Sequence, residues 1–140
     1  MSLIEAQKFI KKKDFGKALN IFLELEKKTP QDERVLFYLG LIYFELNNFK
    51  RCIFYYDKLL KKTPNSISVL YNLAIAKQAV GKVDEAKEIY KRLIKKNKNN
   101  IRAYYGLFVL NQSNLSEEIL DYLDLIKGDD KLSLYEKGIV

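Results

Sequence analysis

Residues able to do chemistry are few in this chain. Histidine is absent from its 140 residues, and Cys52 is the single cysteine. These facts exclude a histidine general base, a Cys–His nucleophile, an internal disulfide and a multi-cysteine metal centre. Carboxylates such as Glu24 stand four residues before a basic residue, here Lys28, which is the spacing of a solvated helix face. We therefore expect no enzymatic activity, no metal and no cofactor.

Basic charge dominates most of the chain. Residues 1–110 contain 22 Lys and Arg against 11 Asp and Glu, whereas residues 111–140 contain 3 against 7, which together give the net charge of +7. Lysine pairs recur at 27–28, 61–62 and 95–96. We interpret them as favourable charges at helix carboxyl ends. The alternative is a cationic edge for nucleic acid, which the scarcity of arginine disfavours.

Location is predicted from the same composition. The longest apolar stretch, from Val35 to Phe44, is too short to span a bilayer, which requires about 20 residues. A lone thiol fits a reducing compartment. We therefore expect a cytoplasmic protein with no membrane partner.

A regular period runs through the sequence. Thr29-Pro30 recurs as Thr63-Pro64, and a similar apolar string begins six residues after each proline. Residues of the same kind also recur with this period, and we call each such set of equivalent positions a column. One column is small (Ala18, Cys52 and Ala86), and another is aromatic (Phe22, Tyr56 and Tyr90). So many columns with one spacing indicate a tandem repeat.

Each period contains the pattern of two helices. Apolar residues recur at intervals of three, four and seven, first in Val35, Leu36, Leu39, Ile42 and Tyr43 and then in Ile53, Tyr56, Leu59 and Leu60. Asn47-Asn48 predicts the turn between the two helices, and 62–65 predicts the end of the second. Gly40 and Ala18 stand where two helix axes must approach to about 8–10 Å.

On these columns the chain resembles the tetratricopeptide repeat (TPR) family. The family's repeat pattern matches Leu39-Gly40 and Leu73-Ala74 at positions 7 and 8, and Pro30 and Pro64 at position 32. Four residues depart from the family pattern, and each weakens the match of its own repeat. They are Lys77, Lys98, Phe108 and Asn111. The resemblance implies an all-α, right-handed superhelix of about four helix hairpins plus a partial fifth.

The repeats are expected to fill one domain, 1–140, with boundaries near 1–32, 33–66, 67–100, 101–130 and a partial repeat at 131–140. Ser2 and Glu5 have the spacing of a capping box at the first helix. Leu134-Tyr135 copies Leu70-Tyr71, so the chain ends inside a helix of the fifth repeat. We interpret the chain as a fragment of a longer repeat protein.

The resemblance also implies a concave groove lined by the first helix of each pair. Its apolar positions hold Phe37, Tyr71 and Tyr105 in one column and Leu41, Ile75 and Val109 in another. Its polar positions include Arg34, Tyr38, Asn72 and Arg102. We expect these ten residues to bind a peptide or helical segment of a protein partner. The alternative is that the apolar columns pack between repeats as core.

The alternative function is self-assembly, in which the chain forms homo-oligomers through the groove or through an open end near Leu134 and Ile139. One TPR subfamily clamps the terminal carboxylate of heat-shock chaperones. Only Asn72 and Arg102 suit that role here, because its other positions hold Phe37, Leu41 and Gly106. The resemblance therefore implies a non-enzymatic scaffold without that clamp.

Overall fold

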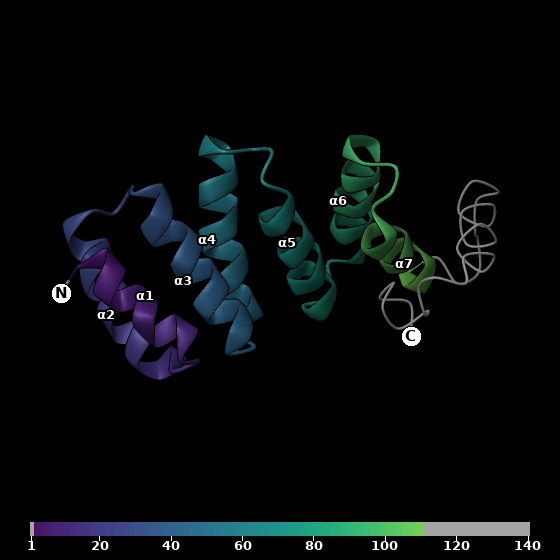
Figure 1. Cartoon of the computed structure of the whole chain (residues 1–140). Coiled ribbons are helices and arrows are strands. Elements are labelled where there is room, and N and C mark those ends of the chain that lie inside the picture. Colours follow the sequence, from purple (N-terminus) through teal and green to yellow (C-terminus); the bar gives the residue numbers. More distant parts are fainter. Residues whose placement is uncertain (1, 111–140) are drawn as a thin grey trace. The chain divides into compact units, whose positions relative to one another are not determined.

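The computed structural model describes residues 2–110, which form seven α-helices and no strand (Figure 1). In chain order the helices are α1 (Leu3–Lys11), α2 (Phe15–Lys28), α3 (Glu33–Glu45), α4 (Phe49–Lys62), α5 (Ile67–Ala79), α6 (Val83–Lys96) and α7 (Ile101–Leu110). The helix pairs predicted for the first three periods are therefore confirmed. The predicted end of the fourth repeat and the partial fifth repeat lie outside the described residues.

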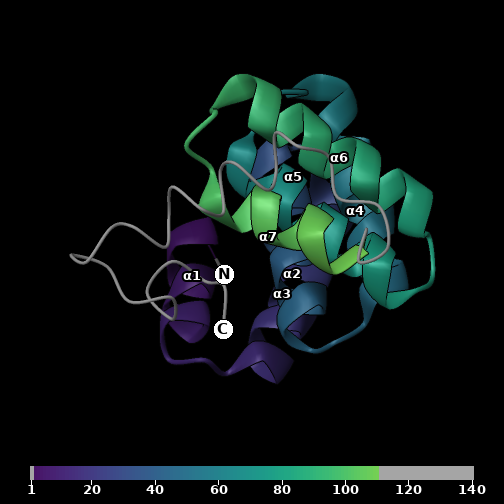
Figure 2. The same ribbon diagram turned by 90° about the vertical axis from the view of Figure 1, so that its right-hand side faces the viewer.

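The described helices group into two compact units. The first is Met1–Lys82 with α1 to α5, where each helix contacts the next and α3 also contacts α5. The second starts at Val83 and contains α6 packed on α7, which lie side by side in both views (Figures 1 and 2). The prediction of one domain, 1–140, with four repeats and a partial fifth stays a prediction.

The first helix of each pair ends in the same turn. Lys13, Asn47 and Gly81, which stand one repeat period apart, have φ angles of 58°, 59° and 86°. The N–H of the following residue donates to a carbonyl five residues back, as from Asn48 to Tyr43 at 2.8 Å. This left-handed turn satisfies the last carbonyl groups of the helix. The predicted Asn47-Asn48 turn is confirmed.

The Thr-Pro pairs end the second helices. Thr29 and Thr63 cap α2 and α4, and their hydroxyl groups donate to the carbonyl oxygens of Leu25 and Leu59 at 3.0 and 3.2 Å. The proline that follows has no N–H and cannot extend the helix. At the other end of the chain, Ser2 and Glu5 form the predicted capping box on α1.

The two predicted columns form the centre of the core. The small residues Ala18, Cys52 and Ala86 are all 0% exposed, and the aromatic residues Phe22, Tyr56 and Tyr90 are at most 2% exposed. The Tyr56 ring lies against Gly40, where an added Cβ would overlap it. Gly40 is thus required for the close approach of α3 and α4, as the sequence predicted.

Glu24 lies on the solvated helix face that its spacing to Lys28 indicates, and it forms a surface ion pair. Its carboxylate pairs with Lys27, three residues on, at 2.9 Å, and both side chains are exposed. The hydrogen bond from Lys27 lowers the pKa of the Glu24 carboxyl group, with the nearby charge of Lys28 as a minor contribution. A long, exposed lysine side chain reaches either spacing, because i+3 and i+4 both lie on the same helix face.

Candidate partner-binding site

The first helix of each pair divides its apolar side chains between two environments. On α3, Leu36 and Leu39 are 0% exposed, whereas Phe37 and Leu41 are only half-buried. The same division holds on α5 and α7, where the half-buried side chains are Tyr71, Ile75, Tyr105 and Val109. The core positions are therefore filled by other residues, and the predicted groove residues keep part of their surface in solvent.

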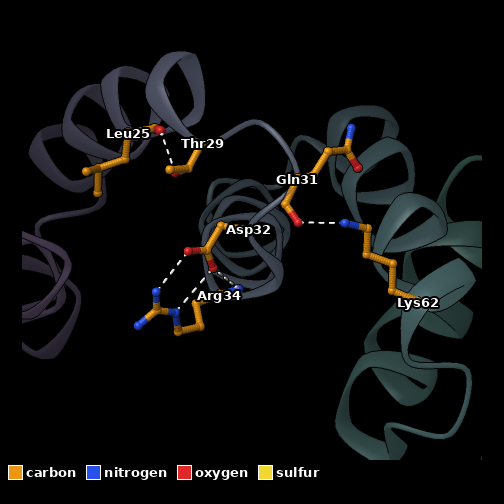
Figure 3. A network of polar contacts seen from close by, with 6 residues as sticks. All are labelled: Leu25, Thr29, Gln31, Asp32, Arg34 and Lys62. Carbon is orange, nitrogen blue, oxygen red and sulfur yellow. Dashed lines mark hydrogen bonds and ion pairs between the residues drawn. The ribbon is translucent and has the colours of Figure 1, made fainter.

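Arg34 stands in the first turn of α3, and Asp32, the N-cap residue of that helix, holds its side chain. Its Nη2 and Nε atoms donate to the two carboxylate oxygens at 2.9 and 3.2 Å, and its backbone N–H donates to the same carboxylate at 2.9 Å (Figure 3). The hydrogen bond from Arg34 lowers the pKa of Asp32. The guanidinium group is exposed but has a defined direction, because a neighbouring carboxylate orients it.

Tyr38 and Asn72 contact the preceding aromatic column. The Tyr38 ring lies 5.2 Å from the Phe22 ring, with an interplanar angle of 32°. Asn72 is a hydrogen-bond partner of Tyr56, whose pKa is raised chiefly by burial. Both predicted site residues therefore also join one helix pair to the next in the first unit.

The contact between a core aromatic residue and the next helix recurs in the second unit. In the second unit, a Cβ on Gly106 would overlap the Tyr90 ring, so that ring packs directly on the α7 backbone. In all three pairs the partner follows the aromatic residue at the same interval along the chain: Phe22 and Tyr38, Tyr56 and Asn72, Tyr90 and Gly106. Sequence reasoning missed these contacts, although the constant interval was available to it.

A hollow of about 420 Å³ opens beside the amino end of α3. Residues of α1, α3, α4, α5 and the adjoining turn line it: Gln7, Glu33, Arg34, Phe37, Tyr38, Leu59, Thr63, Ser66 and Val69. Leu59 and Val69 are 4% and 1% exposed and form its apolar floor. Its size lies within the range of about 300–1,000 Å³ that is typical of ligand sites.

The hollow brings together three of the ten predicted residues: Arg34, Phe37 and Tyr38. Leu41, Tyr71, Asn72 and Ile75 belong to the same unit but do not line it, and Arg102, Tyr105 and Val109 lie on α7 in the second unit. Gln7 was missed although it stands one repeat period before Leu41 in a groove column. The role of the whole set in binding stays a prediction.

The described residues offer little other chemistry. Between residues 2 and 110, no three His, Cys, Asp or Glu side chains gather as a metal site needs. Burial, and then the charge of Asp57, raise the pKa of the Cys52 thiol to about 12, so it is protonated at neutral pH. None of the described helices combines the length and apolar character that a bilayer crossing requires.

Two family models match the sequence. The model described as "Anaphase-promoting complex, cyclosome, subunit 3" matches residues 11–93, more than half of the chain, and the model described as "Tetratricopeptide repeat" matches residues 71–131. No curated protein matches. The chain belongs to the tetratricopeptide repeat family, whose domains are generally non-enzymatic interaction modules.

Solved structures show the same fold. A crystal structure of MamA is 24% identical with a TM-score of 0.71, over 81% of this chain and 65% of that one. MamA 41-end from Desulfovibrio magneticus RS-1 is 14% identical with a TM-score of 0.78, over 90% and 74%. The first TPR of Spaghetti (RPAP3), bound to the HSP90 peptide SRMEEVD, is 19% identical with a TM-score of 0.69, over 78% and 86%.

These likenesses confirm the predicted all-α, TPR-like solenoid. The chain spans less than two thirds of the length of the first of these MamA structures.

Proposed function

We propose that this chain is a non-enzymatic scaffold that binds a peptide or helical segment of a protein partner. The observation that carries the proposal is the half-buried apolar side chains on α3 and α5, Phe37, Leu41, Tyr71 and Ile75. They stand on helices whose core positions are already filled. A partner that covers them gains apolar burial without displacing the core.

The gain in free energy comes from several side chains together. Full burial of one exposed aromatic side chain contributes about 1.5–3 kcal/mol, and each half-buried side chain of the site supplies part of that gain before ordering costs are subtracted. Helices reduce those costs because Phe37 and Tyr71 are already fixed on rigid elements. The hollow beside Phe37 accepts one side chain of the partner as an anchor, and the exposed Arg34 guanidinium at its rim favours a nearby acidic group.

The RPAP3 domain supports the class of ligand, because an array with this fold accommodates a peptide. In this chain, only Asn72 and Arg102 suit the carboxylate clamp of the chaperone-binding TPR subfamily. We therefore propose a segment recognised by its apolar side chains rather than by a terminal carboxylate. A cytoplasmic location is part of the same proposal, and the single unpaired thiol of Cys52 supports it.

The proposal is tested with peptides selected on the chain from a display library. Fluorescence anisotropy then gives the Kd of a selected peptide for the wild type and for Phe37→Ala, Tyr71→Ala and Tyr105→Ala. We expect Phe37→Ala and Tyr71→Ala each to weaken binding at least tenfold, or about 1.4 kcal/mol, with unchanged helicity. Tyr105→Ala tests whether the second unit takes part.

Phe54→Ala is the matched control, because Phe54 is an aromatic residue 47% exposed on α4, outside the predicted set. Equal losses in the control and in Tyr71→Ala would reject the site. Collapse of the circular dichroism signal in Phe37→Ala and Tyr71→Ala would show that these residues are core.

A further inference from the structure

The first repeat exposes a face whose counterpart in the second repeat is covered. One repeat period after Ile4, Ile21, Leu25 and Lys28 stand Tyr38, Tyr55, Leu59 and Lys62. Three of these four equivalents contact the first repeat through a ring or a hydrogen bond. In the second repeat, this face therefore packs on the adjoining repeat.

Each contact is specific. The Tyr55 hydroxyl donates to Glu26 Oε1 of α2 at 3.1 Å, and Lys62 Nζ donates to the carbonyl oxygen of Gln31 at 2.7 Å (Figure 3). The Tyr38 ring packs on the Phe22 ring. This side of α3 and α4 is therefore an interface between helix pairs.

The equivalent apolar residues of α1 and α2 keep part or most of their surface in solvent. Ile4 is 71% exposed, more than any other large apolar side chain of the described residues. Ile21 and Leu25 are half-buried, whereas their equivalents Tyr55 and Leu59 are 3% and 4% exposed. A hollow of about 300 Å³ follows this side of α2, lined by Asn20, Ile21, Glu24, Leu25 and Lys28.

The charges on this face are self-complementary. Glu24 and Lys28 are one turn apart on α2 and both line the hollow, with Ile21 and Leu25 beside them. When two such helices pack antiparallel about a two-fold axis, Glu24 of one chain lies opposite Lys28 of the partner subunit, and the pair forms twice. The existing Glu24 pair with Lys27 joins two highly exposed side chains and exchanges at little cost.

We propose that this N-terminal face, formed by Ile4, Ile21, Glu24, Leu25 and Lys28, binds the same face of a second copy of the chain. This face is equivalent to the side of α3 and α4 that packs on the first repeat. Its apolar residues stand beside one acidic and one basic residue, Glu24 and Lys28, which suits a symmetric contact. The face is distinct from the partner-binding residues of α3 and α5. A dimer formed in this way leaves those residues available to the proposed partner.

Sedimentation velocity of the full chain over a concentration series tests the proposal. We expect a monomer–dimer equilibrium, and we expect Ile4→Glu to raise its Kd by roughly tenfold or more, because the variant replaces the most exposed apolar side chain of the face with a charge. Ile67→Glu is the matched control, since Ile67 is a 50% exposed isoleucine in the first turn of α5. It should leave the Kd unchanged.

A charge exchange tests the pairing itself. Glu24→Lys and Lys28→Glu should each weaken the dimer, because each creates like charges across the axis, and the double variant should restore it. A wild-type chain that stays monomeric at every concentration would overturn the proposal. So would equal effects of Ile4→Glu and Ile67→Glu, a double variant as weak as the single ones, or a dimer lost instead in Tyr71→Ala.

Discussion

At the scale of single residues, glycine and tyrosine determine how closely two helices approach. Tyr56 and Tyr90 are both nearly fully buried, and each packs on a glycine, Gly40 for the first and Gly106 for the second. Alanine is ordinarily the better helix former by about 0.8–1.0 kcal/mol. Glycine fits at these positions because the rings occupy the space that a Cβ would need.

Gly40→Ala should lower the free energy of unfolding by about 1–3 kcal/mol, because the added methyl group overlaps the buried Tyr56 ring. Gly16→Ala is its control. Gly16 is also in a helix, α2, but nothing lies near its added Cβ, so we expect a gain of up to about 1 kcal/mol. Urea titration followed by circular dichroism measures both, and changes of the same sign would contradict the packing argument.

Sequence reasoning predicted some of these residues and missed others for a physical reason. Gly40 was expected, because it stands in a column of small residues between two helices. Tyr38 and Asn72 were expected to face a groove, and their contacts with Phe22 and Tyr56 were not foreseen. A column gives the face of a helix on which a side chain lies, but the rotamer that decides its contact depends on the neighbouring helix.

At the scale of elements, helix ends follow the sequence closely because they depend on local hydrogen bonds. The Thr-Pro pairs end α2 and α4 where predicted, and Ser2 is the N-cap residue of α1. Lys13 is less evident, since a lysine rarely takes a positive φ. Only the position of Lys13, one repeat period before Asn47, indicates the turn. For predicting this turn, the position in the repeat is therefore more informative than the preference of lysine for a negative φ.

The helix α4 buries titratable groups in their neutral forms. Burial, and then the charge of Asp57, raise the pKa of Cys52 from 9.0 to about 12. Burial, and then the hydrogen bond to Glu26, raise the pKa of Tyr55 from 10.0 to about 12. Above pH 9 the unfolded chain releases protons that the folded chain retains, so stability is present below that pH and is lost as the pH rises towards 12.

We therefore expect the free energy of unfolding to decrease steadily from pH 9 to pH 12. Cys52→Ala should make this decrease shallower, and it keeps the packing because alanine occupies the same column in the neighbouring repeats. Chemical denaturation at several pH values measures the slope. An equal slope in the wild type and in the double variant Cys52→Ala/Tyr55→Phe would refute the assignment to these groups.

At the scale of the whole molecule, stability is expected to be the sum of neighbouring helix contacts. Residues 1–82 form a compact unit in which each helix packs on the next. A polypeptide of these residues should therefore show a cooperative urea transition on its own. Leu39→Ala should lower its stability by about 2–5 kcal/mol, because Leu39 is 0% exposed. A gradual, non-cooperative loss of helicity in this polypeptide would contradict the division.

The candidate site was less predictable than the fold. The repeat period determines which residues share a helix face, and this is enough for the helix pairs and the core columns. The hollow beside Phe37 required more, since Gln7, Leu59 and Val69 come from three different helices. Their meeting depends on how helix pairs stack, which no local pattern in the sequence specifies.

The pairs formed by each core aromatic residue and its downstream partner also limit how such a gene can be rearranged. Each junction has its own match of sizes, with tyrosine on phenylalanine, asparagine on tyrosine and, after Tyr90, no side chain at all. A tandem duplication of residues 33–66 would instead place a copy of Tyr38 sixteen residues after Tyr56, where Asn72 stands now. We therefore expect a rearranged array to be stable when each core aromatic residue keeps a downstream partner of matching size.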